Sequence, residues 1–218
     1  MKPYSHLFFD LDGTLTNPKE GITRSVEYAL HTFGIQVENR DSLCCFIGPP
    51  LVESFQTYYH FTPEQAQQGL IKYRERFSKI GIWENKPYPG IKRMLFSLKK
   101  AGKVLAVATS KPTVFANRIL KRFGYLEYFD FVSGSELDGT HNQKYQVIAA
   151  AVDHFAINPD QALMIGDTRF DAEGASRCGI DCIGVLYGFG TKKELESAGV
   201  MQTVESVSEL EKLLLSYC

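Results

Sequence analysis

Two carboxylates stand two positions apart near the N-terminus, where an apolar run ends. Asp10 and Asp12 lie in the segment DLDGTL at 10–15, directly after HLFF at 6–9. If the strand conformation continued, side chains two residues apart would point to the same face. Asp and Gly are also common in an ordinary turn at a strand end. However, two like charges held together cost free energy unless a cation or a catalytic task offsets them, so the pair indicates chemistry.

A second pair of acids follows another apolar run. The segment ALMI at 162–165 leads into Gly166 and Asp167, and Asp171 comes four residues later. Gly166 allows the backbone to come close, so that Asp167 can reach the same cation as Asp10. Magnesium prefers hard oxygen ligands and binds through one or two carboxylates together with substrate phosphate. The acids therefore predict a Mg²⁺ site.

Two further segments could hold an anion. Thr109 and Ser110 follow the apolar run at 104–108 and precede a helical pattern. Hydroxyl and backbone N–H groups at a helix start form an anion site, although the same residues also make an ordinary helix cap. Lys144 opens another helical pattern. Its ammonium would suit a phosphate oxygen as a point charge, although an exposed helical lysine is the commoner case.

The elements that must position these side chains alternate along the chain. Short continuous apolar runs are typical of strands that are covered on both faces. They predict strands at 6–9, 104–108, 129–133, 162–165 and 182–186. Helical periodicity lies between them, at 89–101, 113–123 and 145–155. This alternation predicts an α/β fold with a Rossmann-like parallel sheet and helices on both faces, and ligands bind such sheets at the carboxyl ends of the strands.

One region interrupts the alternation. Residues 17–84 show helical periodicity and no convincing strand, with one helix along 22–33, a second after a Pro-Pro pair and a third along 63–79. We expect an inserted all-helical cap domain there. The core domain would then comprise 1–16 and 85–218. An insert directly after the first strand would hang over the carboxyl edge of the sheet as a lid.

Composition excludes several classes of protein. The 218 residues carry a net charge of -1 without long charge runs, which argues against a binder of nucleic acid or of membrane surfaces. No segment approaches the roughly 20 apolar residues of a membrane span, and the N-terminus does not look like a signal peptide. The five cysteines do not form a disulfide pattern, and Cys178 and Cys182 are interpreted as buried thiols rather than metal ligands. We expect a cytoplasmic protein of unspecified oligomeric state.

Taken in order, these motifs resemble the haloacid dehalogenase superfamily of phosphohydrolases, over essentially the whole chain. The resemblance implies that Asp10 attacks phosphorus and that Asp12 is the general acid and base. It also implies that Asp10, Asp167 and the backbone carbonyl of Asp12 bind Mg²⁺. Asp171 would contact the ion through a water molecule or would contact only the residues that bind it. Many relatives carry Arg where this chain has Thr168, a departure that touches no predicted metal ligand.

The resemblance assigns phosphate binding to Thr109, with Ser110 beside it, and to Lys144. The pattern around Lys144, GSELDGTHNQK at 134–144, resembles phosphoglycolate-phosphatase-like members. Holding the phosphoryl group through a hydroxyl and an ammonium would offset the charge that otherwise repels an anionic nucleophile.

The substrate is expected to be a small phosphorylated metabolite. We favour a phosphoglycolate-phosphatase-like activity, with a 5'-nucleotidase acting on mononucleotides as the near alternative. A sugar-phosphate mutase ranks lower, and a non-catalytic interaction module lower still, because both acids of the first motif are present. Candidate specificity residues are Glu20, Arg24 and Gly48, although exposed charges and a plain helix-start loop are the structural alternatives.

Overall fold

The structure, a computed structural model, describes residues 4–217. Contact density divides the chain into two compact units. The core unit comprises the described residues up to Thr16 together with those from Pro87 onward, and the helical unit comprises Asn17–Lys86. Within the described residues, no helix combines the length and the apolar composition that crossing a membrane requires.

The core unit is built on a six-stranded sheet in which every pairing is parallel. The strand order is β5-β4-β1-β6-β7-β8, so β1 lies at the centre between β4 and β6. The predicted α/β, Rossmann-like fold class is thereby confirmed. The strands are β1 (His6–Phe9), β4 (Val104–Pro112), β5 (Phe131–Ser135), β6 (Ala162–Gly166), β7 (Asp181–Val185) and β8 (Gln202–Val204).

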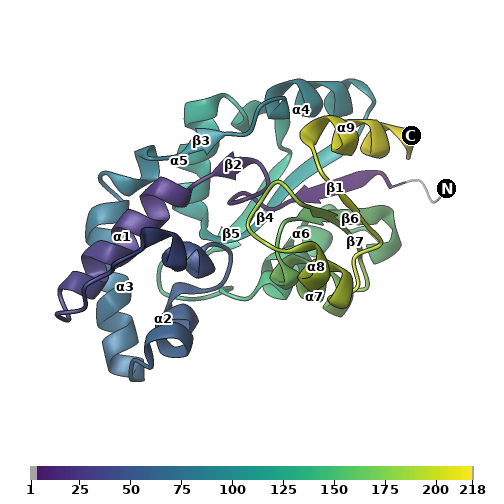
Figure 1. Cartoon of the computed structure of the whole chain (residues 1–218). Helices are drawn as coiled ribbons and strands as arrows, with labels where there is room; N and C mark the ends of the chain where they lie inside the picture. The colour runs from purple at the N-terminus through teal and green to yellow at the C-terminus, as the bar shows by residue number, and fades with distance from the viewer. Residues whose placement is uncertain (1–3, 218) are drawn as a thin grey trace. The chain divides into compact units, whose positions relative to one another are not determined.

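Helices cover both faces of this sheet. Figure 1 shows α4 beside α9 on one side of the sheet and α6 beside α7 on the other, in agreement with their contacts. The helices are α4 (Ile91–Lys100), α5 (Thr113–Phe123), α6 (Lys144–Phe155), α7 (Arg169–Arg177), α8 (Lys192–Ser197) and α9 (Val207–Ser216). Short 3-10 turns η3 (Leu126–Tyr128) and η4 (Pro159–Gln161) precede β5 and β6.

Burial on both faces explains the unbroken apolar runs of the central strands. Phe8 of β1 and Met164 of β6 belong to one buried cluster with side chains of α6 and α7. Leu7 and Phe9, which alternate with Phe8 along the strand, are equally inaccessible to solvent. Side chains on both faces of the strand are therefore apolar, as in sheets with helices on each face.

Several strand boundaries differ from the sequence prediction, two of them by more than one residue for reasons that the structure shows, and one strand was not predicted. β5 spans Phe131–Ser135 rather than 129–133, because Phe129 serves as the C-cap of the 3-10 turn η3. β4 continues to Pro112, four residues beyond the predicted end, because it pairs with β5 as far as Ser135 across an irregular register. The edge strand β8 was not predicted.

The helical unit contains α1 (Lys19–His31), η1 (Arg40–Phe46), α2 (Leu51–Tyr59), α3 (Pro63–Phe77) and η2 (Gly81–Trp83). An aromatic cluster forms its interior, with ring centroids of Phe46 and Phe55 5.0 Å apart and those of Phe55 and Phe61 5.6 Å apart. Contrary to the expectation of no strand, Asn17 belongs to β2 (Thr16–Asn17), which forms a two-residue ladder with β3 (Lys86–Pro87). So short a ladder leaves no apolar periodicity in the sequence.

Candidate active site

Acidic residues gather at the carboxyl ends of neighbouring central strands. Asp10 directly follows β1, and Asp167 directly follows β6, which pairs with β1. Asp171 lies in the first turn of α7. One carboxylate oxygen from each of Asp10, Asp167 and Asp171 lies within 4.8 Å of the others, and all three residues are buried. The sheet topology thus brings together three acids that are far apart in the sequence.

A tight turn follows Asp10, so the strand does not continue to Asp12. The amides of Leu15 and Thr16 both donate to the carbonyl of Leu11 at 3.0 Å. Gly13 has a φ of +92°, in the left-handed region that glycine tolerates best, and a Cβ there would lie 2.1 Å from Asp167 Oδ2. The glycine of the first motif is therefore required by backbone conformation and by the proximity of Asp167.

Lys144 holds two of these acids. Its Nζ lies 2.6 Å from Asp10 Oδ1 and 2.8 Å from Asp171 Oδ1, and it also donates to the carbonyl of Ala108 at 3.1 Å. Gly174 of α7 leaves room for the lysine stem, because a Cβ at that position would lie 2.7 Å from Lys144 Cγ. Lys144 is therefore a buried partner of the candidate nucleophile, not an exposed helical lysine.

Asp171 is fixed by the start of its own helix. The backbone N–H and the hydroxyl of Thr168 donate to Asp171 Oδ2 at 3.0 and 2.9 Å, which forms a capping box. Gly166 provides the space, because a Cβ there would lie 2.2 Å from Asp171 Cγ. Thr168 thus orients an acid of the cluster.

Asp167 is held by the turn after β1 and by the loop YGFG at 187–190. Thr14 Oγ1 donates to Asp167 Oδ1 at 3.3 Å, and the backbone N–H of Phe189 donates to Oδ2 at 2.8 Å. A Cβ on Gly188 would lie 2.3 Å from Asp167 Cβ. The loop packs backbone directly against the carboxylate, a contact that sequence reasoning did not identify.

Thr109 and Ser110 lie inside the extended end of β4, not after it. Thr109 is buried, and its hydroxyl accepts a hydrogen bond from the Lys111 amide at 3.3 Å. The carbonyl of Ser110 accepts from the Ser135 hydroxyl at 2.8 Å. Proline disfavours helical backbone in the residue that precedes it. Pro112 therefore favours an extended conformation at Lys111. Thr109 and Ser110 therefore do not lie at a helix start, because α5 begins only after Pro112, and their part in phosphate binding stays a prediction.

Sequence reasoning missed Lys111. Its Nζ forms a close ion pair with Asp12 Oδ2, and both side chains are buried. Residues two apart on an extended strand share a face, so Thr109 and Lys111 would lie on the same side if the strand continued. That spacing is the signal that could have indicated Lys111. The two acids of the first motif thus each have a lysine, Lys144 for Asp10 and Lys111 for Asp12.

Burial and crowding shift the proton equilibria of the cluster. Burial raises the pKa of Asp10 to about 6, against the opposing charge of Lys144, and the Asp171 carboxylate adds to the rise. Burial and the nearby charges of Asp171 and Asp10 raise the pKa of Asp167 well above its usual range. Burial opposes the charge on Lys144, but the two carboxylates beside it outweigh that effect and raise its pKa.

The donor set fits a divalent cation. Asp10, Asp167 and Asp171 supply oxygen ligands only, which suits a hard ion such as Mg²⁺. Together with Asp12 they make four buried carboxylates around two buried lysines, which leaves a formal excess of two negative charges. A divalent cation would neutralise that excess, which otherwise raises the carboxylate pKa values.

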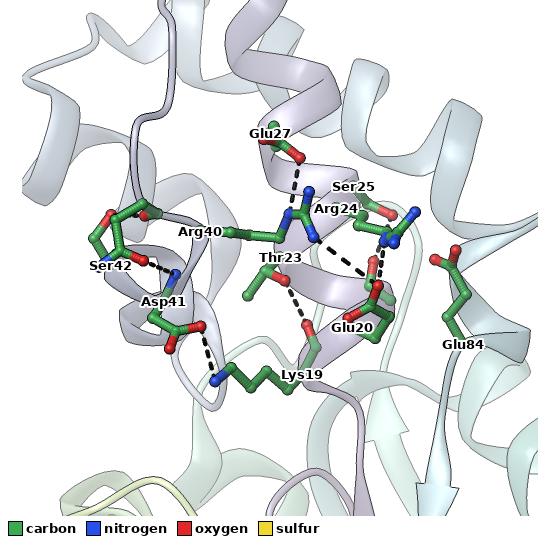
Figure 2. Close-up of polar contacts among 12 residues, drawn as sticks. Lys19, Glu20, Thr23, Arg24, Ser25, Glu27, Arg40, Asp41, Ser42 and Glu84 are labelled. Carbon is green, nitrogen blue, oxygen red and sulfur yellow. Dashed lines mark hydrogen bonds and ion pairs between the residues drawn. The ribbon is translucent and has the colours of Figure 1, made fainter.

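Two of the candidate specificity residues, Glu20 and Arg24, belong to a polar network in the helical unit. Figure 2 shows Glu20 between Arg24 and Arg40, with Arg24 one helical turn further along α1. Both Glu20 and Arg24 are about half exposed, with side-chain accessibilities of 51% and 44%. Gly48 has a φ of +108° in the loop before α2, so backbone conformation alone accounts for a glycine there. Their part in substrate selection stays a prediction.

Comparison with known proteins agrees with this fold. The family described as haloacid dehalogenase-like hydrolase matches residues 7–185. A Pseudomonas aeruginosa protein named 5'-nucleotidase is 43% identical over 214 residues, covering 98% of this chain and 97% of that relative. The crystal structure of a predicted phosphatase from Clostridium acetobutylicum superposes with a TM-score of 0.96 at 48% identity, covering 98% of this chain and 99% of that one.

The chain therefore belongs to the haloacid dehalogenase-like hydrolase family, and its enzymatic class is that of the phosphatases. Two other relatives bear on the choice of reaction. Tyrosine-protein kinase PtkA of Mycobacterium bovis is 34% identical over 95% of this chain and 72% of that protein. Phosphoglycolate phosphatase of Vibrio cholerae is 24% identical over 91% of each.

Proposed function

We propose that the protein hydrolyses phosphate monoesters through an aspartyl-phosphate on Asp10, with Mg²⁺ as cofactor. The observation that carries this proposal is the placement of Asp10, whose carboxylate lies 2.6 Å from buried Lys144 within a cluster of acids. A carboxylate nucleophile divides the hydrolysis into two easier displacements. The nearby ammonium favours approach of an anionic phosphoryl group to an anionic nucleophile.

The reaction is assigned to the two acids of the first motif. An Asp10 oxygen forms a bond to phosphorus while the ester oxygen leaves, and that oxygen takes a proton from Asp12. Asp12, now a carboxylate, accepts a proton from water as the water attacks phosphorus, and the bond to Asp10 breaks to release phosphate. One residue can assist both halves because each half moves a single proton in the opposite direction.

Asp10, Asp167 and the backbone carbonyl of Asp12 would hold Mg²⁺, with Asp171 as a further carboxylate of the cluster. When bound, the ion supplies positive charge that offsets the phosphate and the crowded carboxylates. Lys144 supplies a second, fixed positive charge. Thr109 and Ser110 would hold the phosphoryl oxygens from the extended end of β4.

The substrate class that we propose is a nucleoside 5'-monophosphate. The support is the relative named 5'-nucleotidase, at 43% identity over 98% of the chain, against 24% for the relative named phosphoglycolate phosphatase. Phosphoglycolate, which the sequence motifs favoured, is the second candidate. We further propose a cytoplasmic location, and a role for Glu20, Arg24 and Gly48 of the helical unit in selecting the substrate.

The test is a phosphate-release screen of the intact chain with Mg²⁺ against mononucleotides, phosphoglycolate and sugar phosphates, comparing kcat/KM. Replacement Asp10→Asn should abolish turnover of every substrate while the protein stays folded by circular dichroism. Full activity of that variant would contradict the covalent mechanism. Transfer of phosphate from ATP to tyrosine, without release from any monoester, would instead favour the reaction named for the kinase relative.

A further inference from the structure

Lys111, a buried lysine of the core unit, contacts Asp12, the candidate general acid. The proposed function assigns no role to this lysine. Lys111 pairs with Asp12 Oδ2, and the two side chains retain only 6% and 9% of their accessibility. Burying an ion pair costs desolvation of both partners, and such pairs add little net stability. The pair is therefore better explained by what it does to Asp12 than by stability.

The two oxygens of Asp12 have different surroundings. Lys111 holds Oδ2, whereas Oδ1 is buried and has no hydrogen-bond partner among residues 4–217. A buried acceptor without a partner carries an energetic penalty, so such atoms are uncommon in folded proteins. An oxygen that exchanges a proton with the substrate must be free of hydrogen bonds within the protein, so that it can bind the leaving oxygen when the substrate is present.

The backbone at Lys111 is itself fixed. The Lys111 amide donates to Thr109 Oγ1 at 3.3 Å, and Pro112 pairs with Ser135 of β5. A Cβ on Gly134 would lie 2.6 Å from the Lys111 carbonyl oxygen, so β5 approaches this segment as closely as a glycine allows. The lysine thus extends from a rigid strand end and not from a mobile loop.

We propose that Lys111 is a positioning residue for the reaction: it grips Asp12 Oδ2 and so fixes the carboxylate with Oδ1 available to the leaving oxygen of the substrate. This inference rests on the proposed function, in which Asp12 is the general acid. Proton transfer needs the two heavy atoms within hydrogen-bond reach, about 2.6–3.2 Å. Without Lys111, a buried carboxylate would rotate toward other donors and lose that geometry.

Substrates with different leaving groups can show whether Lys111 acts by positioning the general acid or by another effect, such as binding the phosphoryl group. An alkoxide leaving group, as in a nucleoside 5'-monophosphate, needs a proton when it departs, whereas 2,4-dinitrophenolate is stable without one. The measured quantity is kcat/KM, which reports steps up to departure of the leaving group and excludes hydrolysis of the aspartyl-phosphate. We therefore compare wild type with Lys111→Met on both substrates.

The expected result is selective. General acid catalysis contributes about 10²–10⁴-fold, so Lys111→Met should lower kcat/KM for the mononucleotide about 10²-fold, and that for dinitrophenyl phosphate by less than about 3-fold. Lys111→Gln should show the same selectivity in weaker form, because an amide can still donate to Asp12. The Gln variant carries the test if the Met variant does not fold.

Lys103 provides the matched control. It stands just before β4, at the other end of the strand, is buried to the same degree, and donates to the carbonyls of Tyr4 at 2.6 Å and Tyr217 at 3.1 Å. Lys103→Met removes a buried ammonium from the same region of chain without touching Asp12. Any loss in this variant should be equal for the two substrates.

Each outcome has a stated meaning. A selective loss in the Lys111 variants, absent from Lys103→Met, supports the positioning task. An equal loss on both substrates overturns it and indicates that Lys111 binds the phosphoryl group instead. If wild type hydrolyses both substrates and Asp10→Asn hydrolyses neither, the proposed function stands whatever Lys111 does. If wild type hydrolyses neither substrate, the proposed function fails and this inference fails with it.

Discussion

Replacement of Gly188 by alanine tests the packing of the YGFG loop against Asp167. The backbone of Gly188 does not require glycine, because its φ lies outside the left-handed region. Space is the requirement: a Cβ would lie 2.3 Å from Asp167 Cβ and 2.4 Å from Asp167 Oδ2. The added methyl group must therefore push either the loop or the carboxylate away.

The size of the effect follows from these distances. Ordinary van der Waals contact begins at 3.4 Å, so the two groups must separate by about 1 Å. Such overpacking typically costs about 1–3 kcal/mol of folding free energy. The displacement would also lengthen the 2.8 Å hydrogen bond from the Phe189 amide to Asp167. Disturbing the groups that orient a metal ligand lowers metal affinity about 10–100-fold.

The assay is a Mg²⁺ titration followed by thermal unfolding, with phosphate release measured in parallel. Gly188→Ala should unfold at a lower temperature, by about 2–4 °C for each kcal/mol lost, and should need about 10–100-fold more Mg²⁺ for half-maximal stabilisation. Gly184→Ala is the control, because its Cβ would be crowded at 3.0 Å by Leu195, an apolar side chain. Unchanged Mg²⁺ affinity in Gly188→Ala would refute the assignment of this loop as a support for Asp167.

Three further outcomes are expected. Chelation by EDTA should stop phosphate release and added Mg²⁺ should restore it, so hydrolysis that persists in EDTA would contradict the metal site. Lys144→Met leaves Asp10 and Asp171 buried without their ammonium, and should destabilise the protein by about 3–5 kcal/mol in urea unfolding with loss of turnover; wild-type stability would contradict that pairing. Thr62→Ala removes the capping box with Gln65 at the start of α3, so stability should fall by about 0.5–2 kcal/mol, and an unchanged unfolding midpoint would show that the cap contributes nothing.

The core of the fold was predictable where burial leaves a local pattern. The predicted strand 6–9 coincides with β1, and the predicted strand 162–165 matches β6 to within one residue. Both predictions agree with the structure because these strands are apolar on each face. The edge strand β8 was missed for the converse reason. It is three residues long, and Gln202 is exposed, so it carries too few apolar positions to show any period.

The site was predictable to the extent that it depends on strand ends. Asp10 and Asp167 follow apolar runs, and parallel strands bring such positions to one edge without further information. The signal for the lysine at 111 was weaker, because its spacing of two from Thr109 matters only if the strand continues past the apolar run. The strand does continue, because β4 keeps pairing with β5 across a shift in register, a tertiary effect that the sequence around Thr109 does not display. The contact of Phe189 with Asp167 is equally non-local.

The two lysines also explain how two like charges two residues apart can be buried together. Asp10 and Asp12 share a strand end, but their ammonium partners come from different elements, Lys144 from the start of α6 and Lys111 from the end of β4. Because Lys144 also binds Asp171, its charge is tied to the acid cluster in which a cation would lie. Separate partners allow each carboxylate to be oriented on its own, as the proposed roles of Asp10 in attack on phosphorus and of Asp12 in proton transfer require.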